Sequence, residues 1–312
     1  MIVAVTGGTG FIGRHLIDRL LASEVKVRVL SRYQPLKPVE GVFYHQGDLM
    51  EKESLLGFLD GVDVLYHCAG QLTNETSMRR LHVDGTANLI DVAVGNIRHW
   101  VQLSSVGVYG PVFNGVVTES SPIAPVGEYE ITKAKSDELV SLAASKGWFT
   151  HSILRPSNVF GADMTNQSLF HMVNMIEKGL FFFVGTKGAT ANYVHVDDVV
   201  EALCLCGCHK NAIGEIFNLS DHCMIEDFVK IIASELSVCK PVLRLPKGLV
   251  RIVILLCSWI PQFPLTRTRL QALTSRSVYS TELIQQTLGY HYKVGLKNGL
   301  KSLVHGYKAH HE

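Results

Sequence analysis

Residues 129–138, YEITKAKSDE, place a tyrosine four positions before a lysine in a stretch with helical character. On an α-helix this spacing brings both side chains to one face, about one turn apart. An ammonium close to a phenol favours the phenolate and lowers the phenol's pKa from about 10, so that the tyrosine can exchange protons near neutral pH. Tyr129 and Lys133 are therefore candidate proton-transfer residues. Taken alone, the spacing is also typical of a surface pair, and Tyr33–Lys37 repeats it around a proline that favours a loop.

A glycine-rich turn follows the first apolar run of the chain. The segment TGGTGFIG, residues 6–13, leads directly into a helix-like run. Three glycines at this spacing allow a tight bend, a close approach of backbone to a diphosphate, and packing of the helix on the strand. The diphosphate then lies at the helix N-terminus, where free N–H groups favour anions. The residues that this interpretation assigns to a dinucleotide cofactor are Gly7, Gly10, Phe11, Ile12 and Gly13.

The end of the second apolar run indicates which dinucleotide binds. A carboxylate there accepts the ribose 2′-hydroxyl of NAD, but this chain reads VLSR and has Ser31 and Arg32 at that point. A guanidinium suits the charge and shape of a 2′-phosphate. The sequence therefore predicts NADP, with NAD possible; the alternative is an ordinary surface arginine at a strand end.

Short apolar runs alternate with amphipathic runs through the first two-thirds of the chain. This alternation predicts an α/β fold with a parallel sheet covered on both faces. The expected strands are residues 2–7, 26–32, 42–48, 63–70, 99–105, 149–156 and 215–220. The expected helices are residues 10–23, 54–61, 86–96 and 133–147. After Arg155 the alternation loosens, which predicts a smaller C-terminal substrate-binding domain. We expect residues 1–160 with 192–222 to form the dinucleotide-binding domain, and residues 161–191 with 223–312 to form the substrate-binding domain.

Composition favours a cytoplasmic enzyme. The 312 residues are 47% hydrophobic and 18% charged with a formal net charge of +1, which argues against a partner such as nucleic acid that is bound through bulk positive charge. Seven cysteines without a scaffold spacing are expected to be reduced, and we expect no secretory leader. The apolar stretch 249–260 is too short to span a bilayer. A core or substrate-pocket helix is expected there, with interfacial membrane contact as the alternative.

Cysteines alternate along residues 204–208, and His209 follows them. The run is expected on a helix, where alternate residues point in different directions and cannot converge on one ion. The sequence therefore predicts no metal site.

Together these motifs resemble the extended short-chain dehydrogenase/reductase family, which contains nucleotide-sugar epimerases and dehydratases. The resemblance covers nearly the whole chain and implies a Rossmann-type doubly wound sheet. The motifs that carry it are TGGTGFIG (6–13), GDL (47–49), HCAG (67–70), VDGT (83–86), SSVGVYG (104–110), YEITK (129–133), LRPSNVFG (154–161) and YVHVDDV (193–199).

The resemblance assigns the general acid/base to Tyr129. It gives Lys133 two tasks, lowering the pKa of Tyr129 and hydrogen-bonding the nicotinamide ribose, and it makes Ser105 the hydroxyl that holds the reacting oxygen. Hydride transfer at an alcohol carbon must be matched by proton transfer at its oxygen. Further cofactor positions that the resemblance implies are Asp48 and Leu49 at the adenine, Ala69 and Gly70 near the middle of the cofactor, and Pro156. It assigns Asn158 to the substrate, and it implies a homodimer through helices near Tyr129.

The chain departs from the family pattern at three places. His82 replaces an asparagine, so its local contacts need to be determined. No arginine precedes YVHV, and Arg267, Arg269 or Arg276 are alternatives for a phosphate contact or are solvated charges. Where sugar 4,6-dehydratases carry an Asp-Glu pair after the catalytic hydroxyl, this chain has residues 106–107, Val-Gly, which argues against dehydration. His195, Asp197 and Asp198 resemble a segment that serves packing and helix capping.

Three functions follow as hypotheses. The first is an NAD(P)-dependent oxidoreductase or epimerase acting at a secondary alcohol or ketone, with a nucleotide-linked sugar as the expected substrate. The second is an enzyme similar to 3β-hydroxysteroid dehydrogenases or dihydroflavonol reductases, which the apolar stretches 181–184 and 249–260 favour. The third is a nucleotide-sensing protein without turnover, against which Ser105, Tyr129 and Lys133 argue.

Overall fold

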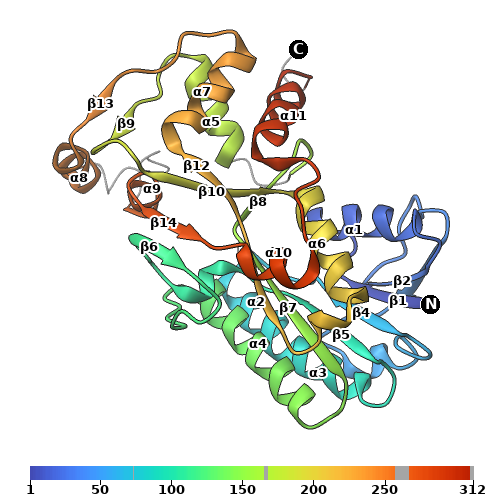
Figure 1. The fold of residues 1–312 in the computed structure, drawn as a ribbon. Coiled ribbons are helices and arrows are strands. Elements are labelled where there is room, and N and C mark those ends of the chain that lie inside the picture. The colour runs from blue at the N-terminus through green and yellow to red at the C-terminus, as the bar shows by residue number, and fades with distance from the viewer. Residues whose placement is uncertain (73, 165–167, 257–266, 310–312) are drawn as a thin grey trace.

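The computed structural model describes residues 1–72, 74–164, 168–256 and 267–309. Its centre is a seven-stranded parallel sheet with the strand order β11-β7-β5-β4-β1-β2-β3 (Figure 1). The strands are β1 (Ile2–Thr6), β2 (Lys26–Ser31), β3 (Val42–Gln46), β4 (Val64–His67), β5 (His99–Leu103), β7 (Thr150–Pro156) and β11 (Ile216–Leu219). The order reverses between β1 and β4, which creates the switch point where ligands of such sheets bind. The predicted doubly wound α/β fold is confirmed.

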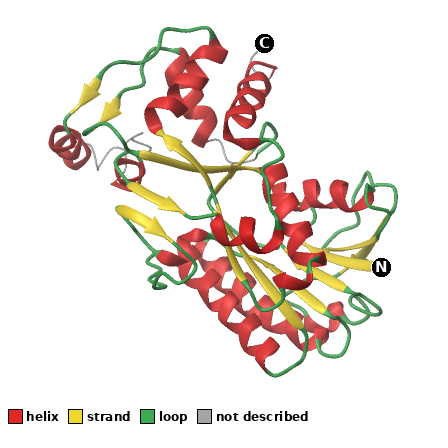
Figure 2. Ribbon diagram, viewed as in Figure 1, coloured by secondary structure: helices red, strands yellow, loops and turns green. Residues whose placement is uncertain are grey.

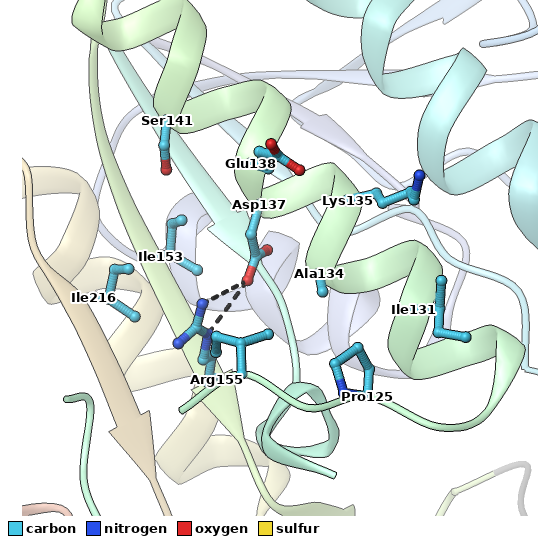
Figure 3. Close-up of a pocket in the computed structure, with 11 residues that line it drawn as sticks. Pro125, Ile131, Ala134, Lys135, Asp137, Glu138, Ser141, Ile153, Arg155 and Ile216 are labelled. Atoms are coloured by element: carbon cyan, nitrogen blue, oxygen red, sulfur yellow. Dashed lines mark hydrogen bonds and ion pairs between the residues drawn. The ribbon is translucent and has the colours of Figure 1, made fainter. Parts of the chain in front are cut away.

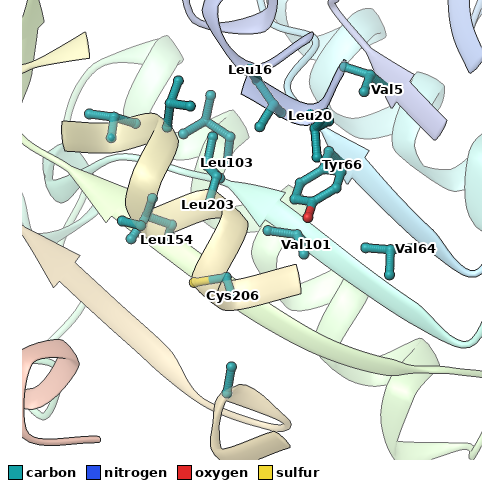
Figure 4. Close-up of a cluster of buried hydrophobic side chains, with 14 of the residues drawn as sticks. Val5, Leu16, Leu20, Val64, Tyr66, Val101, Leu103, Leu154, Leu203 and Cys206 are labelled. Carbon is teal, nitrogen blue, oxygen red and sulfur yellow. The ribbon is translucent and has the colours of Figure 1, made fainter. Parts of the chain in front are cut away.

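Helices cover both faces of this sheet (Figure 2). The helices are α1 (Phe11–Leu21), α2 (Glu75–Arg79), α3 (Gly85–Ala93), α4 (Glu128–Ser145), α5 (Ser168–Glu177), α6 (Val196–Cys208), α7 (Ile225–Leu236), α8 (Lys247–Leu256), α9 (Arg267–Ala272), α10 (Glu282–Leu288) and α11 (Gly295–Ala309). Helices α1, α6 and α10 pack on one face around side chains such as Leu16, Tyr66 and Leu203 (Figure 4). Helices α3 and α4 pack on the other face around Trp100. Because both faces are covered, every residue of β4 and β5 is buried.

Most expected elements of this part are present, and one expected helix is wrong. Residues 54–61 form only the end of a 3₁₀ turn, Lys52–Leu55, followed by turns. Gly57 and Gly61 have φ of 77° and 68°, a left-handed conformation that ends helical structure. Helix α4 begins at Glu128, earlier than expected, so Tyr129 lies in its first turn. Other short turns are the π-helical turn Arg80–Asp84 and the 3₁₀ turns Val106–Tyr109 and Lys210–Ala212.

A second apolar cluster lies beyond the carboxyl edge of β7. It joins α5, α7 and α11 to a three-stranded sheet with the order β12-β10-β8. The remaining strands are β6 (Asn114–Val117), β8 (Asn158–Phe160), β9 (Phe183–Val184), β10 (Thr190–His195), β12 (Asp221–Met224), β13 (Arg244–Leu245) and β14 (Arg276–Tyr279). The division of the chain into two domains at the expected boundaries stays a prediction.

The apolar stretch 249–260 is helical as far as Leu256, where α8 ends, and its last residues lie outside the described part. In the ranges that the structure covers, the helices are too short or too polar to cross a membrane. On α8, Val250 and Ile254 are buried whereas Ile252 and Leu256 are exposed.

The YVHVDDV segment serves packing and capping, as predicted. The Nδ1 atom of His195 accepts a hydrogen bond from the backbone N–H of Asp197 at the start of α6. The Asp198 carboxylate accepts backbone N–H groups of Lys293, Val294 and Gly295 at the start of α11. A carboxylate at a helix N-terminus satisfies donors that the helix itself cannot, so Asp198 ties α6 to α11.

Cys204, Cys206 and Cys208 lie on α6, as expected, and His209 follows its last turn. Cys206 is buried in the core whereas Cys208 is exposed, so the side chains diverge. Over the described ranges, no group of three or more His, Cys, Asp and Glu side chains is arranged to hold a metal ion.

Three buried histidines make the free energy of unfolding depend on pH. Burial lowers the pKa of His67 and of His82 to about 3 and that of His99 to about 4, from the usual 6.5. Below pH 6.5 the unfolded chain binds protons that the folded chain does not bind until these lower values are reached. Each of these groups therefore contributes stability that is complete above about pH 6.5 and is lost as the pH falls.

We expect His99→Gln to weaken this pH dependence, because glutamine does not titrate and so removes the contribution of the lowered His99 pKa. His99 lies at the start of β5, where its ring nitrogens contact Thr150 and Ser152. Urea unfolding at about pH 7.5 and about pH 5 measures it: the difference between the two free energies should be smaller for the variant than for the unchanged protein. His222→Gln, at an exposed position, is the control. An unaltered difference in His99→Gln would contradict the assignment.

Candidate active site

A pocket of about 740 Å³ opens at the carboxyl ends of β1, β2 and β4. Of the residues assigned to the cofactor, those that line it are Gly7, Gly10, Ser31, Arg32, Asp48, Leu49, Ala69 and Gly70. The lining comes from five separate segments of the chain that the switch point of the sheet brings together. This is the place where the sequence predicts the dinucleotide.

The three glycines of the turn have the three properties that the motif requires. Gly7 has φ of 69°, and a Cβ atom there would lie 2.6 Å from the backbone nitrogen of Ala69. Gly13 packs against the turn, since a Cβ atom there would lie 2.2 Å from the carbonyl oxygen of Gly7. Gly10 precedes α1 and lines the pocket. The first N–H groups of a helix lack intrahelical partners, so the turn presents donors suited to a diphosphate.

Phe11, Ile12 and Gly13 begin α1 but do not line the pocket with their side chains. Ile12 packs against the main apolar cluster and Phe11 against the second one. These residues therefore have only backbone N–H groups to offer a cofactor, at the positive end of the helix. Their assignment as cofactor residues stays a prediction.

Two arginines line the nucleotide pocket. Arg32 follows β2, where Ser31 donates its hydroxyl to the Tyr33 carbonyl at 2.6 Å and so holds the chain in a turn. Arg80, at the start of the π-helical turn, supplies a second cation from the other side of β1. Arg80 could not be predicted from the sequence, because nothing local distinguishes it from a solvated helix arginine.

Tyr33 also lines the pocket, although its Tyr-x-x-x-Lys spacing was expected to have no role in chemistry. Residues 32–39 form a loop, as Pro35 predicts, so Tyr33 and Lys37 do not share a helix face. The side chain of Tyr33 is 76% exposed. Its position fits contact with a nucleotide at the open end of the pocket and not proton transfer.

Ser105 and Tyr129 meet at the carboxyl end of β5. Ser105 precedes the 3₁₀ turn Val106–Tyr109 and its Oγ accepts the N–H of Gly107 at 3.1 Å. The Ser105 side chain lies close enough to the phenol of Tyr129 to lower the pKa of Tyr129. The structure therefore brings together the two hydroxyls that the sequence assigns to one reacting oxygen.

Lys133 lies on the same face of α4, and its ammonium donates a hydrogen bond to the Leu103 carbonyl at the end of β5. It is 4% exposed, and burial lowers its pKa. The expected lowering of the Tyr129 pKa by Lys133 is not found in this structure. Burial, with the Glu130 and Asp137 carboxylates adding to it, raises the pKa of Tyr129 to about 12. The spacing correctly predicts the shared helix face, but burial and the two carboxylates determine the direction in which the pKa of Tyr129 shifts.

One turn beyond Lys133 on α4, Asp137 forms a buried ion pair of 3.1 Å with Arg155 (Figure 3). Ser104 donates its hydroxyl to the same carboxylate oxygen at 2.7 Å. Both charged residues line a second pocket of about 340 Å³ between α4 and the strands β7 and β11. None of the assigned cofactor residues lines this second pocket, so it is distinct from the nucleotide site.

Three other assigned or alternative contacts lie apart from the nucleotide pocket. Asn158 begins β8 and donates its side-chain amide to the Asn192 carbonyl at 3.1 Å. Pro156 is the last residue of β7 and is buried. The Arg276 guanidinium donates to the Lys187 carbonyl and to a neighbouring threonine at the surface. Asn158 and Pro156 keep their assigned roles as predictions. The side chain of Arg267 lies outside the described residues.

At the two residues where dehydratases carry their acid and base, this chain has a close contact and apolar packing. A Cβ atom at Gly107 would lie 2.8 Å from the Glu130 side chain. Val106 packs in a small apolar cluster with Val108. The local packing agrees with the argument against elimination of water.

The fold and this arrangement define an extended short-chain dehydrogenase/reductase, and the comparison with protein families agrees. The model of the NAD dependent epimerase/dehydratase family matches residues 3–220. The chain belongs to this family, and the resemblance drawn from its motifs is confirmed.

Relatives within the family act on different substrates. A 4-hydroxy-2-methyl-3-oxo-4-farnesyl-3,4-dihydroquinoline-1-oxide ketoreductase of Stigmatella aurantiaca is 30% identical over 234 residues, 71% of this chain and 69% of the relative. A dTDP-6-deoxy-L-talose 4-dehydrogenase (NAD(P)(+)) of Kitasatospora kifunensis is 37% identical over 176 residues, 54% of this chain and 55% of the relative. The chain thus spans about half to two-thirds of the length of these relatives.

Among solved structures, a UDP-glucose 4-epimerase of Thermotoga maritima with UDP-glucose superposes with a TM-score of 0.78. It covers 100% of both chains at 20% sequence identity. At this identity the likeness establishes the shared fold.

Arg32 tests the choice of cofactor. We expect Arg32→Ala to weaken NADPH binding by about 1.5–3 kcal/mol, the range for a hydrogen bond to a charged group, and NADH binding much less. Titration of both reduced cofactors by fluorescence measures the difference. Arg98→Ala, at a residue whose side chain is 85% exposed and pairs with Asp63, is the control. An equal loss of affinity for both cofactors would rule out contact with a 2′-phosphate.

Proposed function

We propose that this protein is an NADP-preferring oxidoreductase or epimerase acting at a secondary alcohol or ketone of a nucleotide-linked sugar. The observation that carries the proposal is the proximity of the Ser105 hydroxyl to the Tyr129 phenol, together with a pocket suited to a dinucleotide. A bound nicotinamide supplies the hydride-transfer chemistry. The chain's own residues position the alcohol oxygen and move its proton.

The proton step follows from the two hydroxyls. Tyr129, with a raised pKa, is protonated at neutral pH and can donate its proton to the oxygen of a ketone as that oxygen gains charge. Ser105 can donate a second hydrogen bond to the same oxygen, as an oxyanion-stabilising group does. In the reverse direction, a substrate hydroxyl gives its proton to Tyr129 only when the phenol's pKa is lowered. The residues fit NADP: Lys133 would bind the ribose and bring its charge to bear on Tyr129, and Arg32 would hold the 2′-phosphate.

Two features support an apolar substrate as the second candidate. The name of the Stigmatella relative describes a farnesylated ketone as its substrate. Helix α8 presents Leu249 and Leu255, 49% and 52% exposed, near the smaller sheets. A nucleotide-sensing protein without turnover is the remaining alternative, and the proximity of Ser105 to Tyr129 argues against it.

A panel assay separates these candidates. The protein is incubated with NADPH or NADH and, in turn, with nucleotide sugars, 4-keto nucleotide sugars, a 3-ketosteroid and a prenylated cyclic ketone. Cofactor absorbance and product identity are followed together. The proposal requires turnover of a nucleotide sugar with NADPH preferred. Turnover confined to the apolar ketones supports the second candidate, and cofactor binding without any turnover supports the third.

We also propose that the protein acts as a homodimer through α4 and its surroundings. Ile123, Val126 and Leu142 expose 47%, 70% and 53% of their surface on or before α4. Ile123 lines the second pocket beside Arg155, so a second copy could cover apolar and charged groups together. Sedimentation of the protein and of Leu142→Glu tests it, and a monomeric unchanged protein would contradict it.

Tyr129→Phe tests the assigned proton transfer. The variant keeps the ring and its packing but lacks the ionisable group. We therefore expect cofactor binding to persist while kcat falls by ~10²–10⁴. Lys133→Ala should lose both kcat and cofactor affinity, because the resemblance gives it both tasks. Tyr290→Phe is the matched control, since Tyr290 is also a buried tyrosine with a raised pKa but contacts the Asp198 carbonyl, remote from the site. A normal kcat in Tyr129→Phe would refute the assignment.

A further inference from the structure

His82 occupies a structural position that the proposed reaction does not explain. It lies in the π-helical turn Arg80–Asp84, which joins α2 to α3, and its side chain is 2% exposed. Single π-helical turns cost hydrogen-bond geometry and are frequent at functional sites. The turn directs His82 between the pocket loop 69–71 and the first turns of α4.

Both ring nitrogens of His82 are used, and their partners fix the tautomer. The backbone N–H of Gln71 donates to Nε2 at 2.9 Å, so Nε2 carries no proton. The proton of the neutral ring is then on Nδ1, which donates to the Thr132 hydroxyl at 2.8 Å. Thr132 in turn donates to the Glu128 carbonyl at 2.8 Å, in the first turn of α4. One continuous chain of hydrogen bonds therefore runs from the pocket loop to the catalytic helix.

The imidazole also contacts the catalytic tyrosine directly. The rings of His82 and Tyr129 lie edge to face with their centroids 5.7 Å apart and their planes at 78°. This is a favourable arrangement for two aromatic rings, and it limits how far the Tyr129 ring can turn. Gln71, at the other end of the hydrogen-bond chain, lines the nucleotide pocket.

His82 is poorly suited to exchange protons itself. Burial and the nearby Lys133 ammonium lower its pKa to about 3. Protonation of Nε2 would also place an N–H group against the Gln71 N–H group. A neutral ring with both nitrogens satisfied can hold its neighbours in place over the whole range of pH in which the protein would be assayed.

We propose that His82 is a positioning residue that couples the cofactor loop 69–71 to Tyr129, so that cofactor binding and proton transfer share one support. The proposal rests on the proposed function in so far as Tyr129 transfers the proton. The asparagine that the family resemblance places here is too short to serve both partners. At this backbone position an asparagine amide would end about where Nδ1 lies, so we expect it to reach Thr132 and not the loop. The coupling is thus a property of histidine in this chain.

Three substitutions separate the two arms of His82. His82→Asn keeps a donor near the position of Nδ1 and so keeps the Thr132 arm. His82→Gln places its carbonyl near the position of Nε2 and so keeps an acceptor for the Gln71 N–H. His82→Phe keeps a ring against Tyr129 but loses both hydrogen bonds. The control is His99→Phe, another buried neutral histidine with both nitrogens bonded, at the opposite end of β5.

Each variant is assayed for NADPH affinity, for kcat, for the urea midpoint, and for hydrogen exchange of the Gln71 amide without cofactor. We expect His82→Asn to raise the NADPH Kd about tenfold and to speed Gln71 exchange, with kcat within about twofold. We expect His82→Gln to keep Kd and Gln71 protection within about twofold but to lower kcat about tenfold. His82→Phe should show both losses, and His99→Phe neither, although its midpoint falls.

A different pattern overturns the proposal. If kcat, Kd and exchange in all four variants simply follow the urea midpoint, His82 serves stability alone. Unchanged Kd and Gln71 exchange in His82→Phe would also refute the coupling. A third outcome separates this proposal from the proposed function. If the NADPH Kd values and the Gln71 exchange rates change as expected but no substrate is turned over, the proposed reaction fails while the link from His82 to the cofactor loop stands.

Discussion

The buried ammonium of Lys133 is the interaction on which the site depends. A desolvated cation is costly unless other groups compensate it, and here two groups do so. The Leu103 carbonyl accepts its hydrogen bond, and the Asp137 carboxylate, one turn further along α4, favours its charged form. Arg155 and Ser104 then hold Asp137 in place from β7 and the end of β5. Burying Lys133 therefore requires α4 to be fixed against both strands, and this places Tyr129 beside Ser105.

This network contributes little to the stability of the fold. Its main effect is to fix the position of α4 against the sheet. Buried ion pairs rarely improve on apolar packing, and one oxygen of Asp137 has no hydrogen-bond partner within the described part of the chain. An apolar contact would hold α4 to the sheet equally well, but it would allow small shifts along the helix axis. Directional hydrogen bonds from Lys133 and Arg155 allow far less, and proton transfer depends on distances of this order.

The sequence predicts the parts of this site whose signals are local. The strands follow from their apolar runs. The turn at Gly7 follows from its glycines, because a positive φ and close contacts with backbone require glycine there. The pairing of Ser105 with Tyr129 came from motif resemblance and is present in the structure. The helix expected at 54–61 failed because two glycines in left-handed conformations interrupt an apolar pattern that a helix and a set of turns share.

What the sequence could not predict depends on burial and on contacts between distant segments. Spacing shows that Lys133 and Tyr129 share a helix face, but the pKa of Tyr129 depends on how much water the sheet and the neighbouring turns exclude. The role of His82 needs the π-helical turn, which has no clear sequence signature, and partners 11 and 50 residues away. Arg80 and Tyr33 reach the pocket only because the sheet brings the ends of β2 and β4 together.

The two ends of the site differ in exposure, and this difference suits their tasks. At the open end, the arginine after β2 and Tyr33 remain accessible, where charge can attract an anionic nucleotide and contribute affinity. At the closed end, Lys133 and His82 are almost fully buried and water is excluded, so each hydrogen bond and charge acts more strongly. Affinity gained at the open end can then offset the cost of desolvating the reacting groups, which is how binding energy contributes to catalysis. The hydrogen-bond chain from Gln71 through His82 to α4 joins these two ends, and it connects the exposed pocket to the buried hydroxyls to which we assign proton transfer.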